Sequence, residues 1–252
     1  MNVTGEALLL RRFPFGESSL VVHVLTADGR RLHLVARGAY RPKSRLFGAL
    51  DFFDTLELTW TERKGLGEVR KADLARRRRG LTRDLARYRA ASAGLELVHQ
   101  AAHEENREPR VFAALEGFFD HLEDPGRDPL IERLAFDLEL LDAVGLAPAL
   151  ETCASCAGAA PPVEPGKAAF SAAAGGRLCA ACAARERAGG ARVGTLPVEV
   201  LAGAALLVRT SAAARRELPP PPAALLRALV DFVDRFLEYH LETRLVARTR
   251  TV

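Results

Sequence analysis

Four cysteines, arranged as two C-x-x-C pairs, place the strongest constraint on how this chain can fold. Cys153 and Cys156 form the first pair, Cys179 and Cys182 form the second, and 22 residues separate the pairs. Two such turns can bring four thiolates to one tetrahedral Zn²⁺ ion, and four thiolates leave no coordination position open for catalysis. The spacing therefore predicts one structural zinc ion and a zinc finger over residues 151–190, stabilised by the metal.

Two other interpretations use the same cysteines: a pair of disulfide bonds, or a thioredoxin-like redox pair. A cytoplasmic location argues against disulfides, and the lack of a βαβ pattern argues against the redox pair. The cytoplasmic prediction rests on an N-terminus without signal-peptide features and on the lack of an apolar run long enough to cross a bilayer.

Positive charge is concentrated in residues 1–79, which hold 16 Lys and Arg against 9 Asp and Glu. Residues 80–252 hold 20 against 23. A basic module joined to a slightly acidic remainder predicts a polyanion as partner, with nucleic acid favoured over membrane. Neither a lipidation motif nor a basic amphipathic helix supports membrane binding.

The basic module has the alternation of short β-strands. Five are predicted: Glu6–Phe13, Ser19–Thr26, Arg30–Ala36, Phe52–Thr61 and Glu68–Leu74. Asp28-Gly29 predicts a hairpin turn between the second and third strands. Five strands in so short a segment predict a small closed barrel, either SH3-like or of the oligonucleotide-binding (OB) type. Most aromatic residues of the module are expected in its core, namely Phe13, Phe15, Phe47, Phe52, Phe53 and Trp60.

One loop of this module carries the candidate nucleic-acid contacts. The stretch Val35–Phe47, VARGAYRPKSRLF, contains no acidic residue and is broken by Gly38 and Pro42. A solvated charged loop is the alternative interpretation. The candidate DNA-binding residues are Arg37, Arg41, Lys43 and Arg45, with Tyr40 to stack on a base. Arg76, Arg77, Arg78 and Arg79 follow the last strand, either as a second phosphate contact or as a solvated linker.

The remainder, apart from the finger, has helical periodicity. Apolar residues recur at helical spacing over Leu81–Val98, Val111–Leu122, Leu130–Val144, Pro197–Thr210 and Leu225–Arg248. His99 and His103 are expected on the surface, because no Glu completes a zinc-protease motif between them. The sequence shows no phosphate-binding loop, nucleophile elbow or paired-carboxylate site, so we expect no enzymatic activity.

Four motifs, in order, resemble those of the RecO family of bacterial DNA repair and recombination mediators. They are GESSLVVHVLTADGRRLHLVARGAYRPKSR, LELLDAVGLAPALETCASC, FSAAAGGRLCAAC and VDRFLEYHLETRL. The resemblance implies an α+β multidomain fold, with an OB-fold barrel (1–79), a helical domain (80–150 and 191–252) and an embedded four-cysteine zinc finger (151–190). Arg37, Arg41, Lys43 and Arg45 match the basic OB loop of the family.

The resemblance also implies a function. Proteins of this family bind single- and double-stranded DNA, anneal complementary strands in the nucleoid and work with RecR. They help RecA replace single-strand-binding protein (SSB), whose C-terminal tail some of them bind. The alternative is a protein-interaction adaptor that docks RecR or SSB while the partner holds most of the DNA.

Overall fold

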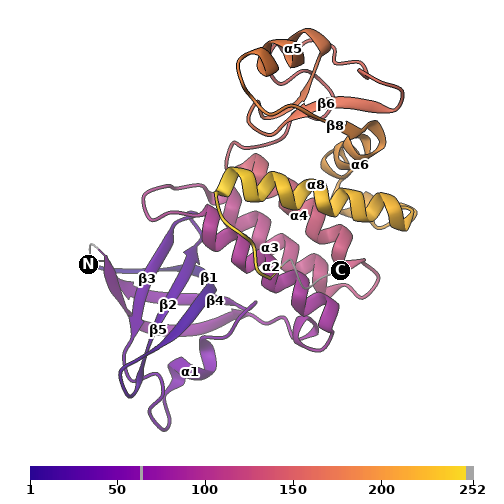
Figure 1. Ribbon diagram of the computed structural model, residues 1–252. Coiled ribbons are helices and arrows are strands. Elements are labelled where there is room, and N and C mark those ends of the chain that lie inside the picture. The colour runs from indigo at the N-terminus through magenta and orange to yellow at the C-terminus, as the bar shows by residue number, and fades with distance from the viewer. Residues whose placement is uncertain (63–64, 248–252) are drawn as a thin grey trace. The chain divides into compact units, whose positions relative to one another are not determined.

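The computed structural model describes residues 1–62 and 65–247 (Figure 1). It divides into two compact units, Met1–Phe136 with Leu245–Val252, and Asp137–Arg244. The domain boundaries expected after residues 79, 150 and 190 divide the chain more finely and stay predictions. Among the described residues, none of the helices combines the length and the apolar character that crossing a membrane requires.

Five strands of the first unit close into a barrel. They are β1 (Asn2–Phe15), β2 (Ser19–Thr26), β3 (Arg31–Ala36), β4 (Thr55–Thr61) and β5 (Leu66–Arg76). Neighbours follow the order β1-β2-β3-β5-β4, and β4 pairs with β1 to complete the closure. Among the described residues of the barrel, only β3 and β5 pair in parallel, and the short helix α1 (Arg45–Ala49) lies in the connection from β3 to β4. The predicted barrel is confirmed, and of the two types left open it has the OB topology.

Strand alternation fills the barrel core. Leu20, Val22 and Val24 of β2 point inward and pack with Leu34 and Trp60, all at most 3% exposed. The sequence prediction that aromatic residues fill the core holds for Trp60 and for the partly buried Phe52. Phe53 is also buried, but its ring packs on Phe119. The prediction is wrong for Phe13, Phe15 and Phe47, which are 43%, 50% and 45% exposed.

The turn between β2 and β3 forms where Asp28-Gly29 predicted it. Asp28 accepts hydrogen bonds from the Thr26 hydroxyl and from Arg30 Nε. Gly29 has φ +85°, and a Cβ at this position would lie 2.0 Å from the Glu108 carbonyl oxygen. Glycine is therefore required both by the backbone conformation and by the close approach of the helical segment.

The helices of the first unit come after the barrel strands in the sequence (Figure 1). They are the 3₁₀ turn η1 (Gly80–Thr82), α2 (Leu85–Ala101), α3 (Pro109–Glu123) and α4 (Pro129–Ala143), which crosses into the second unit. Asp84 caps α2 by accepting a hydrogen bond from the Arg87 N–H (2.8 Å). Glu123 accepts from the N–H groups of Gly80 and Leu81, which holds η1 against α3. α2, α3 and α4 lie where apolar periodicity predicted helices, but the predicted start at Leu81 falls in η1, and α2 begins at Leu85.

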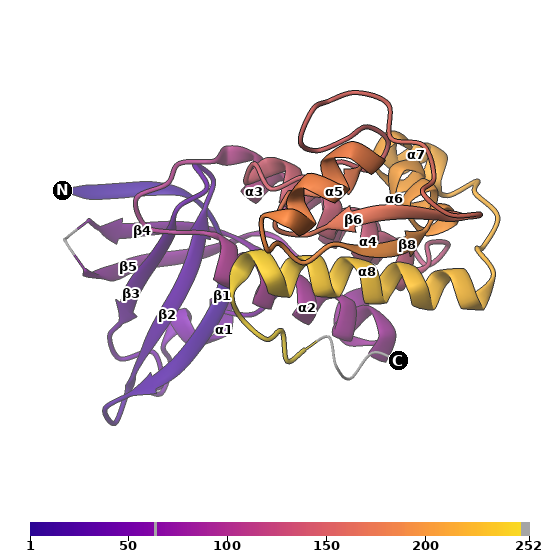
Figure 2. The ribbon, with the colours of Figure 1, turned by 45° about the horizontal axis from the view of Figure 1, so that its top comes forward.

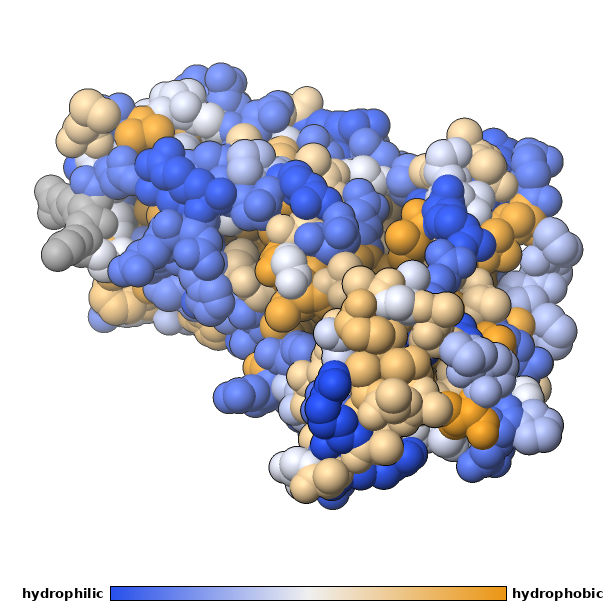
Figure 3. All heavy atoms as spheres, turned by 90° about the horizontal axis from the view of Figure 1, so that it is seen from above, coloured by the Kyte–Doolittle hydropathy of each residue, from blue (hydrophilic) through white to orange (hydrophobic). Residues whose placement is uncertain are grey.

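In the second unit, a small sheet and a helix form the finger. The elements are β6 (Lys167–Ser171), β7 (Gly176–Leu178), α5 (Ala180–Ala188) and β8 (Gly194–Pro197), with strand order β7-β6-β8. At the start of β7, Gly176 has φ +150°, and a Cβ would lie 2.4 Å from the Ala149 carbonyl oxygen. The core of the finger is made mainly of small residues such as Ala160, Ala169 and Ala183. Figure 3 shows the molecule from above the view of Figure 1. On this face, pale orange residues, which are moderately hydrophobic, lie beside dark blue hydrophilic residues.

Three helices complete the second unit: α6 (Val198–Arg209), α7 (Ala212–Arg215) and α8 (Ala223–Leu241). α6 packs against α8, and β8 leads directly into α6 (Figure 2). The ring of Phe170 on β6 contacts Phe232 and Phe236 of α8 edge-on, at 5.3 and 6.0 Å between centroids. The last helix ends at Leu241, where Glu242 has φ +49°, so the predicted extension to Arg248 is wrong up to residue 247. Arg248 itself lies outside the described residues.

Candidate nucleic-acid interface and candidate metal centre

The basic loop between β3 and β4 is a folded turn anchored to the barrel. The Tyr40 N–H donates to the Ser18 carbonyl (2.9 Å), which ties the loop to the β1–β2 turn. Gly38 and Lys43 both have positive φ, so the chain reverses twice within six residues. The segment after Ser44 then forms α1, a helix that the sequence analysis did not predict. The loop therefore presents its side chains from a fixed backbone.

The four predicted cations of this loop are exposed. Arg41, Lys43 and Arg45 form no ion pair with any residue that the structure describes. Arg37 lies 3.5 Å from Glu68, but its side chain is 69% exposed, so water screens this pair. The structure thus brings four solvated cations together on one loop, as a site for an extended polyanion requires.

Aromatic rings lie among these cations. The rings of Tyr40 and Phe47 are 5.1 Å apart, and each is 45% exposed. The guanidinium of Arg12, at the end of β1, lies 5.9 Å from the centre of the Phe47 ring and 5.0 Å from that of Phe52. Arg12 and Phe47 were not predicted as site residues, because their proximity depends on the barrel and not on local sequence.

The four arginines after β5 differ sharply from one another. Arg76 pairs with Asp120, and Arg77 lies 3.7 Å from Asp54. Both remain about half exposed, and Arg79 is exposed without an ion pair to any described residue. These three residues stay candidates for a secondary phosphate contact.

Arg78 is buried and has a structural role, which argues against its predicted contact with DNA. Its side chain is 1% exposed and its Nε donates to Asp120 of α3 (2.7 Å). Its Nη1 donates to the Phe53 carbonyl and to the Thr55 hydroxyl, both at 2.9 Å. A phosphate could reach this guanidinium only if these hydrogen bonds broke. Arg78 therefore connects the barrel to α3.

A cluster of three histidines lies on the outer face of β2 and β3. His23 Nδ1 and His99 Nε2 share a hydrogen bond of 2.8 Å, and the His33 ring stacks on His23 at 4.0 Å. The prediction that His99 lies on the surface is wrong, because this residue of α2 is only 9% exposed; His103 is exposed as expected. Hydrophobic spacing alone could not reveal a partner 76 residues away.

Burial and nearby positive charge keep His23 and His99 neutral. Burial is the main cause that lowers the pKa of His23 to about 4, with smaller contributions from His33, Arg31 and Arg11. Burial also lowers the pKa of His99 to about 3, and Arg11 and Arg31 lower it further. At neutral pH the hydrogen-bonded pair of His23 and His99 is therefore uncharged.

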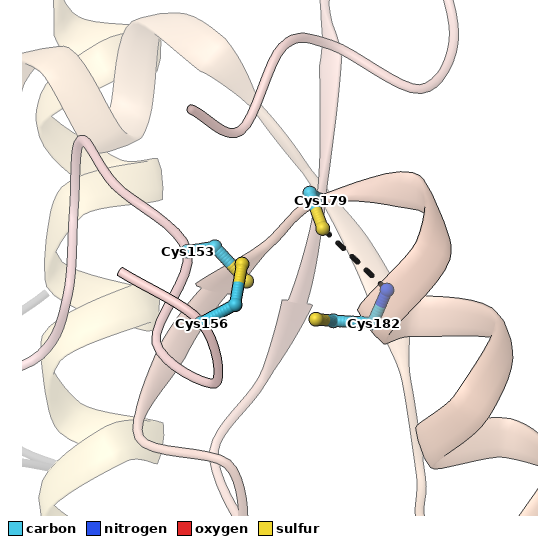
Figure 4. A group of neighbouring side chains, drawn as sticks. All are labelled: Cys153, Cys156, Cys179 and Cys182. Carbon is cyan, nitrogen blue, oxygen red and sulfur yellow. Dashed lines mark hydrogen bonds between the residues drawn. The ribbon is translucent and has the colours of Figure 1, made fainter. Parts of the chain in front are cut away.

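The four cysteines converge on one point (Figure 4). Their sulfur atoms all lie within 4.8 Å of one another. Cys153 and Cys156 come from a turn in which the Ala157 N–H donates to the Cys153 carbonyl (2.8 Å) and Ala157 has φ +57°. Cys179 follows β7 and caps α5, because its sulfur accepts from the Cys182 N–H (3.5 Å).

This donor set fits a tetrahedral metal ion. A Zn–S bond of about 2.3 Å implies sulfur atoms about 3.8 Å apart, so a modest contraction of the cluster would complete the site. Burial raises the pKa of the Cys153 thiol, but the N–H groups of Cys179, Cys156 and Ser155 outweigh this effect and lower it to about 6. Hydrogen bonding to Cys179, aided by burial, raises the pKa of Cys182 to about 12. Four thiolates at this spacing would need a bound cation to balance their charge.

Two protein-family models match this chain, one over the barrel and one over most of the remainder. The family model for the Recombination protein O N terminal matches residues 1–78. The family model for the Recombination protein O C terminal matches residues 82–249. The chain belongs to the RecO family.

Curated relatives from the RecO family match this chain, two of the three described here along nearly its full length. DNA repair protein RecO of Anaeromyxobacter sp. strain K is 36% identical over 251 residues, or 98% of this chain and 94% of the relative. The RecO of Anaeromyxobacter dehalogenans strain 2CP-1 is 36% identical over 250 residues, with the same coverage. The RecO of Halalkalibacterium halodurans is 29% identical over 178 residues, or 71% of this chain and 68% of the relative.

Proposed function

We propose that this chain is a non-enzymatic mediator of DNA repair and recombination. It binds single- and double-stranded DNA and anneals complementary strands. With RecR, it promotes loading of RecA onto DNA coated with SSB, whose C-terminal tail it binds. One observation carries the DNA-binding part: Arg41, Lys43 and Arg45 are exposed on an anchored loop of an OB-type barrel and pair with no described carboxylate. RecO-family membership supports the rest.

Annealing in this proposal is an electrostatic process without covalent chemistry. Two DNA strands repel one another through their phosphates, and a cationic surface that holds both reduces the repulsion and releases counterions. Arginine suits the task because its planar guanidinium grips phosphate through two hydrogen bonds and also stacks on bases. The loop contributes three arginines, Arg37, Arg41 and Arg45, and the ammonium group of Lys43 adds a fourth positive charge.

The four cysteines would hold one Zn²⁺ ion with a structural role. The ion would supply cohesion that the alanine-rich core of the finger lacks. Because all four ligands are thiolates, the ion would have no open position for a substrate, in agreement with a non-enzymatic function.

The test removes the loop charges and compares the result with an equal loss of charge elsewhere. One variant replaces Arg37, Arg41, Lys43 and Arg45 with Ala. The control replaces Arg187, Arg192, Arg227 and Arg235, which are exposed residues of the second unit. The loop variant should weaken binding to unrelated sequences alike and reduce the slope of log K against log salt by about 0.7–0.9 for each phosphate that is no longer neutralised. Equal slopes in both variants would contradict the assignment.

Strand annealing on DNA pre-coated with SSB tests the mediator role. The wild-type chain should anneal coated complementary strands, and the loop variant should be slower. Fluorescence anisotropy with labelled DNA, with and without RecR, then separates direct DNA binding from an adaptor role. DNA binding that appears only when RecR is present would favour the adaptor.

A further inference from the structure

The basic loop is one end of a longer track of aromatic and arginine side chains. From Tyr40 the track passes to Phe47, then to the Arg12 guanidinium and on to the Phe52 ring, in steps of 5.1, 5.9 and 5.0 Å. The Leu50 carbonyl accepts a hydrogen bond from Arg12 Nη1 (2.8 Å), which fixes this cation between the two rings. Single-stranded nucleic acid stacks its bases on aromatic rings, and neighbouring arginines add to the attraction.

Beyond Phe52 the track opens into a cleft of about 410 Å³ between the barrel and α2, all within the first unit. Its walls include the rings of Phe52 and Tyr88, the side chains of Arg11 and Ser92, and Leu95. Small-ligand sites have volumes of about 300–1,000 Å³ and combine apolar walls with a few polar groups. The cleft has the size and the composition of such a site.

Tyr88 gives this cleft a rigid aromatic wall. Its ring is 46% exposed and stands edge-on against Phe53, at 5.6 Å and 88°. Phe53 is itself fixed edge-on against Phe119, at 5.5 Å and 83°. An exposed ring held in this way can stack on a planar base at little cost in side-chain entropy.

The charges around the cleft favour a ligand that carries phosphate. Arg11 forms no ion pair with the described part of the chain, and Arg12, next to it in sequence, lies 3.8 Å from the exposed carboxylate of Asp51. Among the described residues that line the cleft, Glu96 is the one carboxylate, and it is hydrogen-bonded by the chain itself. It accepts hydrogen bonds from the N–H groups of Val246 (2.9 Å) and Ala247 (2.8 Å). The cleft therefore offers a free cation beside aromatic walls, while its acidic group is bound to the C-terminal segment.

We propose that this cleft is a subsite for an unpaired base of single-stranded DNA, with Tyr88 as the stacking partner, Phe52 as an apolar wall and Arg11 near the phosphate. The inference rests on the DNA binding proposed above and extends its path from the loop along Phe47 and Arg12. A duplex keeps its bases stacked inside, so it cannot use the subsite. The subsite contributes only to single-strand binding.

The experiment compares two full-length variants of Tyr88 with a matched control. Tyr88→Leu removes the ring face and Tyr88→Phe keeps it. Tyr239→Ala removes a ring of α8 with similar exposure, 52%, which lies in the second unit. Binding to an oligothymidylate and to a duplex of equal length is measured by anisotropy over a range of salt concentrations.

Tyr88→Leu should weaken single-strand binding by on the order of tenfold, the effect of removing one stacking interaction with a base, with the salt slope and duplex binding unchanged. Tyr88→Phe and Tyr239→Ala should bind both DNAs like the wild type. Photocrosslinking of wild-type protein to DNA that carries 5-iodouracil should in addition place an adduct within residues 85–101 of α2.

Negative results of these experiments distinguish an error in the subsite from an error in the proposed DNA-binding function. If the four-residue loop variant loses DNA binding while Tyr88→Leu binds normally and no adduct forms on α2, the subsite is wrong and the proposed function stands. If the loop variant also binds normally, both fail. An equal loss on single strands and duplex after Tyr88→Leu would overturn the subsite too, because stacking on an unpaired base cannot weaken duplex binding.

Discussion

At Arg78, packing decides the role of a residue that looks like its neighbours in the sequence. Arg76, Arg77 and Arg79 keep much of their side chains in solvent, whereas carboxylates on α3 and polar groups of the barrel surround Arg78. Its guanidinium also lies 5.9 Å from the centre of the Phe119 ring. The nearest carboxylates come from residues 116 and 120, about forty positions along the chain, so the local sequence of four arginines cannot distinguish them.

Loss of this arginine should therefore destabilise the first unit. Arg78→Met removes the buried guanidinium from Asp120 and Glu116, which keep only their contacts with Arg76 and Thr55 among the described residues. We expect this loss to cost about 2–4 kcal/mol of unfolding free energy, because both carboxylates are partly solvated. Arg79→Met, one residue away and exposed, is the control and should change stability by less than about 0.5 kcal/mol. Urea unfolding monitored by circular dichroism measures both. Equal stabilities of the two variants would show that the Arg78 network contributes little.

The end of α2 covers part of the barrel face formed by β2 and β3, and histidines form the contact. The contact includes the His23–His99 hydrogen bond and a hydrogen bond from Arg31 Nη1 to the His99 carbonyl. Charged neighbours on the facing elements are Arg11, Arg31 and Glu104, the last lying 3.4 Å from His33. A proton added to this cluster would place a cation in a buried and already positive setting.

Acid should therefore loosen the contact between α2 and the barrel. The pKa of His99 is about 3 in the folded chain and close to its ordinary value of 6.5 when unfolded, so unfolding takes up a proton. The contribution of His99 is complete above about pH 6.5 and declines as the pH falls toward 3. Wild-type stability should drop by on the order of 1–2 kcal/mol from this residue between pH 7.5 and pH 5.

Chemical denaturation at several pH values tests this expectation with a paired substitution. His99→Gln cannot take up the proton, so its stability should vary less with pH over this range. His103→Gln changes an exposed histidine of the following loop and should reproduce the wild-type curve. A wild-type curve that matches that of His99→Gln would rule out the assignment to His99.

Sequence patterns were informative wherever a structure depends on neighbours in the chain. Alternation in β2 and β3, the Asp28-Gly29 turn and the two C-x-x-C pairs each determine their geometry within a few residues. The short elements α1 and β8 were missed, because five and four residues carry too little periodicity. Burial of His99 and Arg78, and the meeting of Arg12 with Phe47, depend on tertiary contacts that no local pattern encodes.

At the scale of the whole molecule, the two units have different sources of cohesion. The first unit has a barrel core of large apolar residues such as Leu9, Leu58 and Trp60. The finger in the second unit depends on four cysteines and a few alanines, and Phe170 joins it to α8. Loss of a metal should therefore affect the units unequally.

Removal of zinc by a chelator should loosen the second unit and spare the first. Amide hydrogen exchange should speed up over the finger, residues 151–197, and more weakly along the face of α8 that carries Phe232 and Phe236, while β1–β5 keep their protection. The reason is that zinc binding supplies about 10–16 kcal/mol in isolated fingers, far more than a small alanine core. Cys179→Ser should reproduce the pattern without chelator. Protein purified without metal, with four free thiols and full protection of the finger, would contradict the zinc site.

Trp60 gives the chain a built-in optical reporter. It is the single tryptophan of the sequence and is 3% exposed inside the barrel. Emission excited at the red edge of its absorption therefore follows the integrity of the barrel and is silent about the finger. A fluorescence melt and a far-ultraviolet melt of the same sample should separate whenever the second unit opens first, so the unaltered chain can reveal its own order of unfolding.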